Sequence, residues 1–191
     1  LFVSNASGGM NPEFQIGDAE TRGCIRTTSG EIKLRACVTS ESPYIIVEAE
    51  ATEGERGFTW RFYPESTDSP RQLNAILKKS KNHFKKDYIS NPASQLYERN
   101  GLNYCWQPLL AGGGTATVWK EIRKGNKSVL VISNAHSFPE TDALKKAETA
   151  LANLQTADIS LLRQAHRDWW HNYYPQSFIS LPDKKIENFY W

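Results

Sequence analysis

The chain has 191 residues, a formal net charge of +2, 39% hydrophobic residues and 12% aromatic residues. This composition excludes a chain that is disordered over most of its length, and the nearly balanced charge gives no support to a general role in binding nucleic acid or a membrane surface. No apolar stretch approaches the roughly 20 residues of a membrane span. The length suits one domain, or one domain with an appendage.

Alternating apolar and polar residues predict β-strands from Ile25 to Pro64. In the stretch 31–38 (EIKLRACV), the even-numbered residues are apolar and most odd-numbered ones are polar or charged. One face of the sheet should therefore be buried and the other exposed to solvent. Turn-forming residues at 28–30, 41–43 and 53–57 divide this region into a meander of four antiparallel strands.

The next region, residues 66–100, allows two interpretations. Apolar residues at near-helical spacing and an early proline favour a helix, and a long ordered loop that crosses between sheets is the alternative. Strand patterns then return at 101–110, 114–125 and 127–136, which would form a second meander or extend the first.

After Pro139 the apolar residues recur every three or four positions, which predicts two helices. Thr141 can cap the first of them. Thr156 or Asp158 can begin the second, which Pro175 should stop.

A third helix is expected within 181–191 (LPDKKIENFYW), with Asp183 as its cap. Its apolar face would consist of Ile186, Phe189 and Tyr190. This face has no evident partner, so we expect the sequence to be cut from a larger protein, with a further segment removed before Leu1.

No specific catalytic or metal-binding pattern is present. The histidines form no HExxH motif, and His166 and His171 would point roughly 140° apart on a helix. The three glycines at 112–114 lack the Lys-Ser/Thr of a phosphate loop and are typical of a strand connection. No GxSxG motif occurs.

The cysteines Cys24, Cys37 and Cys105 also lack the spacing of a zinc site. A bridge between Cys24 and Cys37 is left open by the sequence. The odd number of cysteines fits either a reducing compartment or a buried thiol in an exported protein.

The tryptophans fall into two groups. Trp60, Trp106 and Trp119 lie in expected strands, where packing in the core or between sheets outweighs a role as sugar-stacking platforms. Trp169 and Trp170 are adjacent on a helix and cannot share one face. At least one of them should therefore point toward a neighbouring domain, solvent or a ligand.

The stretch 165–191 (AHRDWWHNYYPQSFISLPDKKIENFYW) resembles the junction in six-hairpin glycoside hydrolases, where a helical linker leads into an (α/α)6 catalytic barrel. It is most similar to glycoside hydrolase family 95 and its uncharacterised relatives. In such proteins an N-terminal supersandwich of two large antiparallel sheets precedes the linker. The stretch 101–121 (GLNYCWQPLLAGGGTATVWKE) is similar in style to that sandwich.

The resemblance implies a mainly β fold with C-terminal helices. An antiparallel β-sandwich would span residues 1–139, and 140–191 would form the helical linker and the start of a barrel. The chain would be a non-catalytic part of a carbohydrate-degrading hydrolase that shapes the cleft of its barrel, with the catalytic residues beyond residue 191. The alternatives are a stand-alone carbohydrate-binding module and a protein-interaction domain.

The expected partners are the chain's own catalytic barrel and carbohydrate, and the parent protein is expected to be exported to the periplasm or the extracellular space. We expect no metal centre and no cofactor, and nothing in the sequence indicates a structural calcium ion. Candidates for contacting carbohydrate are Trp106, His166, Trp169 and Trp170. Candidates for packing between domains are Ser177, Asp183, Phe189, Tyr190 and Trp191.

Overall fold

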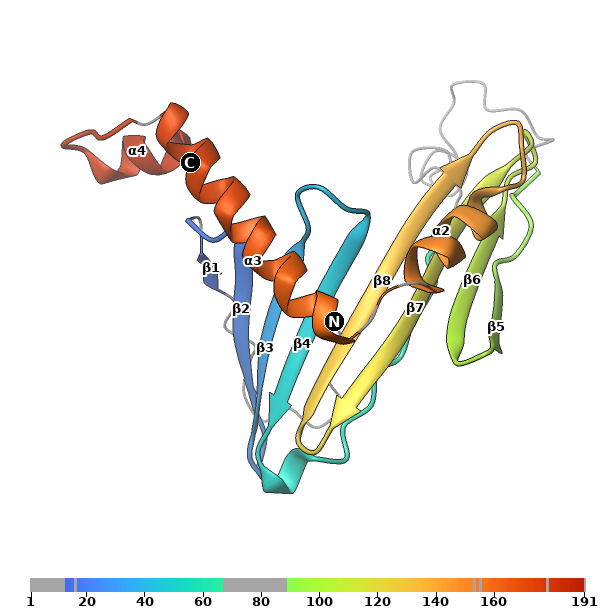
Figure 1. Ribbon diagram of the computed structural model, residues 1–191, viewed down its shortest axis with the longest axis horizontal. Coiled ribbons are helices and arrows are strands. Elements are labelled where there is room, and N and C mark those ends of the chain that lie inside the picture. Colours follow the sequence, from blue (N-terminus) through green and yellow to red (C-terminus); the bar gives the residue numbers. More distant parts are fainter. Residues whose placement is uncertain are drawn as a thin grey trace, which may run out of the picture. The chain divides into compact units, whose positions relative to one another are not determined.

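The computed structural model describes residues 13–15, 17–66, 89–152, 154, 156–177 and 179–190. The chain divides into two compact units. Unit 1 comprises Leu1–Thr59, Glu121–Ile132 and Asn153–Trp191, and unit 2 comprises Trp60–Lys120 and Ser133–Ala152. The elements, labelled as in Figure 1, are β1 (Glu13–Gln15), β2 (Glu20–Arg26), β3 (Glu31–Val38), β4 (Tyr44–Ala51), the 3₁₀ helix η1 (Glu53–Glu55), β5 (Gln95–Arg99), β6 (Leu102–Pro108), β7 (Gly114–Lys124), β8 (Lys127–Ser137), α2 (Ala143–Ala152), α3 (Thr156–Tyr173), the 3₁₀ helix η2 (Tyr174–Gln176) and α4 (Lys184–Tyr190).

Unit 1 is built on the antiparallel meander β1-β2-β3-β4. Its register pairs Ile25 with Ile32 and Ala36 with Val47. The turn between β7 and β8 joins the same unit, because Asn126 exchanges two hydrogen bonds of 2.9 Å with the backbone of Ala51. These contacts extend the hydrogen bonding of the unit beyond β4.

Helix α3 belongs to unit 1 and passes across β2, β3 and β4 (Figure 1). Its buried side includes Ile159 and His166, which are seven residues apart and therefore lie on the same face of the helix. On the sheet, Cys37 and Ile46 are cross-strand partners and are both buried. The helix thus lies on the face of Arg35 and Cys37, which the alternation in β3 predicts to be exposed to solvent.

Unit 2 is a second antiparallel set, in which β5 pairs with β6 and β6 pairs with β7. Its core holds four residues with no exposed surface, which are Tyr104, Cys105, Ala116 and Val118. Helix α2 belongs to the same unit and buries Ala143, Ala147 and Leu151, which recur every four residues along one face.

The helix ends follow local chemistry. Asp183 Oδ1 accepts hydrogen bonds from the backbone of Lys185 and Ile186 at the start of α4, at 2.9 and 3.4 Å. Pro175 lies at the start of η2, directly after α3 ends. The cap that we expect for α2 is wrong: the carbonyl of Asp142, rather than residue Thr141, accepts the first helical bond.

The expected mainly β fold with C-terminal helices is confirmed, as are the strands at β6, β7 and β8 and the limits of α3. The face-to-face packing of two sheets that defines a sandwich, and the domain boundary after residue 139, stay predictions. The fourth strand expected near 58–64 is wrong, because this segment forms no ladder.

In the uncertain region 66–100, residues 95–99 form strand β5, and 67–88 lie outside the described residues. All five residues of β5 are exposed, so the strand has no buried face to produce an alternating pattern. The short strand β1 also lacks a signal of its own, because its three residues are too few to show a period.

Gly113 provides a test of the packing of unit 2. Its φ is +65°, and a Cβ there would lie 2.0 Å from the carbonyl oxygen of Ser137. We expect Gly113→Ala to lower the free energy of unfolding by about 2–4 kcal/mol, since backbone strain and a clash add. Gly101→Ala is the control, because Gly101 has a φ of +74° but open space around it and should lose only about 1 kcal/mol. Urea unfolding of both variants checks this, and equal losses would contradict it.

Candidate functional site

A polar cluster in unit 1 is centred on Glu20, at the start of β2. Its side chain has no exposed surface. Its carboxylate accepts hydrogen bonds from Arg167 of α3 at 2.9 Å and from Arg22 of β2 at 3.2 Å. Asp18, in the turn before β2, also contacts Arg22 at 3.1 Å. One buried carboxylate therefore joins the sheet to the helix.

A second ion-paired group lies on β3 and β4. Glu48 accepts hydrogen bonds from Arg35 Nε at 2.8 Å and from Arg163 Nη1 at 2.6 Å. The side chains of Glu48 and Arg163 are each 19% exposed. Because Arg163 comes from α3 and Arg35 from β3, this group also joins helix and sheet.

The two groups follow the period of the helix. Arg163, Arg167 and His171 are spaced by four residues and form one stripe along α3. They meet Glu48, Glu20 and Asp18, in that order. His171 Nε2 lies 3.0 Å from Asp18 Oδ1. We call this set of three carboxylates and three basic helix residues, with Arg22 and Arg35, the α3 clamp.

The electrostatics of the α3 clamp favour structure over catalysis. The hydrogen bond from His171, with the charges of Arg167 and Arg22, lowers the pKa of Asp18 below its ordinary value. Burial raises the pKa of the nearby Cys37 thiol to about 11, so Cys37 is not a reactive thiolate. Glu20 presents no surface to a substrate. The carboxylates of Glu20 and Glu48 are therefore engaged in holding α3 on the sheet.

His166, a sequence candidate for contacting carbohydrate, is 1% exposed. Its Nε2 lies 3.3 Å from the carbonyl oxygen of Ala19, and its Nδ1 is buried without a hydrogen-bond partner. Ala19 itself has a φ of +48°, which a non-glycine residue adopts only when its surroundings hold it. His166 packs the helix against this turn and does not face solvent.

Trp169 and Trp170 belong to an aromatic cluster at the end of α3. Trp169 stacks on Tyr173 with centroids 4.9 Å apart and planes 13° apart, and Trp170 lies 5.0 Å from the ring of Tyr174. Trp170 Nε1 is buried without a partner, whereas Tyr173 is 51% exposed. The cluster thus has a buried side and a solvent-exposed side, as expected because two adjacent residues on a helix cannot share one face.

Trp106, the remaining candidate for contacting carbohydrate, lies on β6 in unit 2 and is half-buried. Its indole covers Gly114 so closely that a Cβ at position 114 would lie 2.3 Å from the ring. A glycine is required there because the ring occupies the place of a side chain. Trp106 therefore has a packing role in the sheet.

The candidates for packing between domains lie after α3. Asp183 caps α4, Ser177 is exposed, and Phe189 is 92% exposed. Tyr190 ends α4, and Trp191 lies outside the described residues. The packing role itself stays a prediction.

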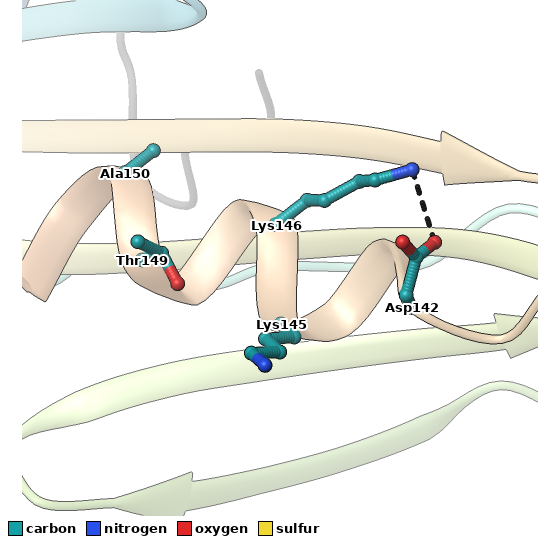
Figure 2. Close-up of a pocket in the computed structure, with 5 residues that line it drawn as sticks. All are labelled: Asp142, Lys145, Lys146, Thr149 and Ala150. Atoms are coloured by element: carbon teal, nitrogen blue, oxygen red, sulfur yellow. Dashed lines mark ion pairs between the residues drawn. The ribbon is translucent and has the colours of Figure 1, made fainter.

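An open pocket of about 450 Å³ lies on α2 in unit 2. Figure 2 shows its lining residues, which are Asp142, Lys145, Lys146, Thr149 and Ala150. The amino group of Lys146 is paired with Asp142 at 3.0 Å. All of these residues come from the helix or the residue before it, so the pocket brings together no groups from distant parts of the chain.

Within the described ranges, no group of three or more His, Cys, Asp or Glu side chains could hold a metal ion. The three cysteines are free thiols, so the bridge between Cys24 and Cys37 that the sequence left open does not form. No helix among the residues placed in the structure is long and apolar enough to cross a membrane.

Comparison with known proteins adds no assignment: no protein-family model matches the chain, and no curated protein matches it.

None of the eight residues of the α3 clamp was among the sequence candidates. The available signal is the four-residue spacing of Arg163, Arg167 and His171, which puts three basic side chains on one helix face. Their acidic partners lie 115 to 153 residues away in sequence, and no local pattern connects them.

Glu20→Gln tests the α3 clamp. The substitution leaves Arg167 and Arg22 facing a neutral amide, so we expect a loss of about 2–3 kcal/mol in the free energy of unfolding. Glu53→Gln is the control, because the pair Glu53–Arg56 is exposed (77% and 55%) and should contribute less than about 1 kcal/mol. Urea unfolding measures both, and a loss for Glu20→Gln as small as the control's would refute the clamp.

Asp18→Asn tests the electrostatics of the same cluster. Because the pKa of Asp18 in the folded chain lies below its ordinary value of 3.8, the charged form stabilises the fold above pH 3.8. That stabilisation is lost as the pH falls through the folded pKa. We expect Asp18→Asn to be less stable than the wild type near neutral pH and the difference to vanish in acid. Unfolding measured over this pH range checks it; a pH-independent difference would contradict the assignment.

Proposed function

We propose that this chain is the non-catalytic N-terminal sandwich and linker portion of a carbohydrate-degrading glycoside hydrolase, which packs on a catalytic barrel and shapes its cleft. The observation that carries the proposal is the exposed aromatic and apolar surface at the end of α3 and on α4. Tyr173, Ile186 and Phe189 are 51%, 57% and 92% exposed. Burying large apolar side chains of this kind stabilises an interface by roughly 1.5–3 kcal/mol each.

The α3 clamp supports the same function. A helix that carries an interface must be held in a fixed position on its own unit, and Glu20 and Glu48 hold α3 through Arg167 and Arg163. Since Glu20 and Glu48 are engaged by arginines, the proposal places the catalytic carboxylates of hydrolysis in the proposed barrel. A polysaccharide substrate lies outside the cell, so the proposal includes export of the protein.

The first test is enzymatic. The 191-residue chain should hydrolyse no aryl-glycoside, while a protein extended by the proposed barrel should do so. Hydrolysis by the 191-residue chain itself, at a rate that survives repurification, would refute the non-catalytic role.

The second test addresses the interface. Tyr173→Ser combined with Phe189→Ser should lower the free energy of unfolding of the 191-residue chain by about 1 kcal/mol, because Phe189 is 92% exposed while Tyr173 loses its stacking on Trp169. In the extended protein the same pair should lower the free energy of unfolding by clearly more than this. Leu161→Ser is the matched control, since Leu161 is 68% exposed on α3 but lies outside the aromatic cluster. If the pair and the control behaved alike in the extended protein, the interface would lie elsewhere.

A further inference from the structure

The register of unit 2 gathers uncharged polar side chains on one face of β6 and β7. Trp119 pairs with Asn103, Thr117 with Cys105, and Thr115 with Gln107, and cross-strand partners project from the same side of a sheet. The opposite face carries Tyr104 and Val118, which have no exposed surface. On the face of Trp119, Cys105 and Thr117 are also buried, whereas the pairs Trp119–Asn103 and Thr115–Gln107 are partly exposed. Solvent therefore reaches this face at those two pairs.

Strand β8 adds two exposed side chains to this face. Asn134 Nδ2 donates to Thr117 Oγ1 at 3.0 Å, and His136 Nδ1 lies 3.4 Å from Thr115 Oγ1. Asn134 and His136 are both exposed. These contacts orient the amide and the imidazole while leaving their other polar atoms available for hydrogen bonds to a ligand.

An aromatic stack lies at the Trp119 end of the face. The ring of Phe62 stacks on Trp119, with centroids 4.7 Å apart and planes 29° apart. Phe62 is 36% exposed, so the stack presents part of an aromatic surface to solvent. Along β7, Trp119 and Thr115 are separated by four residues, or about 13 Å. Gln107, which pairs with Thr115, donates to the carbonyl of Glu65 at 2.9 Å and closes the far end.

We propose that this face binds a neutral oligosaccharide, with a sugar ring against Phe62 and hydroxyl groups hydrogen-bonded to Asn134 and His136. Amide, hydroxyl and imidazole groups both donate to and accept from hydroxyls, and an aromatic ring packs against the apolar side of a sugar. No Lys or Arg stands among the β6, β7 and β8 residues that the register and these contacts place on this face. The lining therefore favours a neutral ligand over an anionic one.

This binding face goes beyond the proposed function, because it lies in unit 2 and requires neither α4 nor a barrel. If the hydrolase proposal failed, the proposal of a binding face in unit 2 would be unaffected. Conversely, the interface test on Tyr173 and Phe189 does not involve these residues.

The experiment is calorimetric titration of the whole 191-residue chain with maltohexaose, cellohexaose and xylohexaose, and with an oligogalacturonate as the anionic comparison. We expect at least one neutral hexasaccharide to bind at millimolar concentration or below and the oligogalacturonate to bind more weakly. No heat from any neutral ligand, or preference for the anionic one, would overturn the proposal.

Two variants locate the binding. Phe62→Ala should lower the affinity about tenfold, the effect expected from losing an aromatic contact, and His136→Ala should lower it severalfold. Tyr63→Ala is the control, because Tyr63 is another aromatic residue of the same segment and is 65% exposed. His136 is exposed, so its variant remains informative if Phe62→Ala affects folding. Affinity unchanged in both Phe62→Ala and His136→Ala, or lowered equally in Tyr63→Ala, would refute this location.

Discussion

The buried carboxylate of Glu20 is the constraint on which unit 1 depends. Removing a charge from water costs several kcal/mol, and the cost is offset only when partners of opposite charge are held close. Arg22 is supplied by the same strand, but Arg167 is supplied by a helix 147 residues later. The position of α3 on the sheet is therefore a condition for burying Glu20. Without the helix, Glu20 would keep Arg22 but lose the charge of Arg167.

The same constraint fixes the register of α3. Arg163 and Arg167 are one helical turn apart, and they meet Glu48 and Glu20 on different strands. Sliding the helix by one turn would bring one arginine to the other's partner and leave one carboxylate of the α3 clamp without its partner on the helix. An apolar contact surface would tolerate such a shift at smaller cost, because hydrophobic attraction has no direction. Ion pairs thus give this interface a specificity that Ile159 and Ile46 alone would not provide.

The sequence predicted those parts of the fold whose patterns are local. Strands β6, β7 and β8 have alternating or β-branched residues between glycine-rich turns, and α3 and α4 have helical periodicity with recognisable ends. The α3 clamp could not be predicted, because its acidic and basic members are far apart in sequence. Alternation in β3 suggested that Arg35 and Cys37 face water, yet α3 covers them, and Val38 on the other face is 65% exposed. The pattern identified two faces correctly, but a charged face can be covered when a helix supplies opposite charges.

The two units use their polar residues in different ways, and this difference bears on function. In unit 1 the carboxylates of Glu20 and Glu48 are taken up by arginines, so they hold the fold together and are withheld from chemistry. In unit 2 the exposed amide and imidazole of Asn134 and His136 make one side-chain contact each in the face described and keep further hydrogen-bonding capacity. Carboxylates paired with arginines stabilise the fold, whereas neutral groups with spare hydrogen-bonding capacity can bind a ligand. The polar groups of unit 2 are therefore suited to the proposed ligand, which carries hydroxyl groups. The helix of unit 1, held in place by its ion pairs, is suited to presenting an apolar surface.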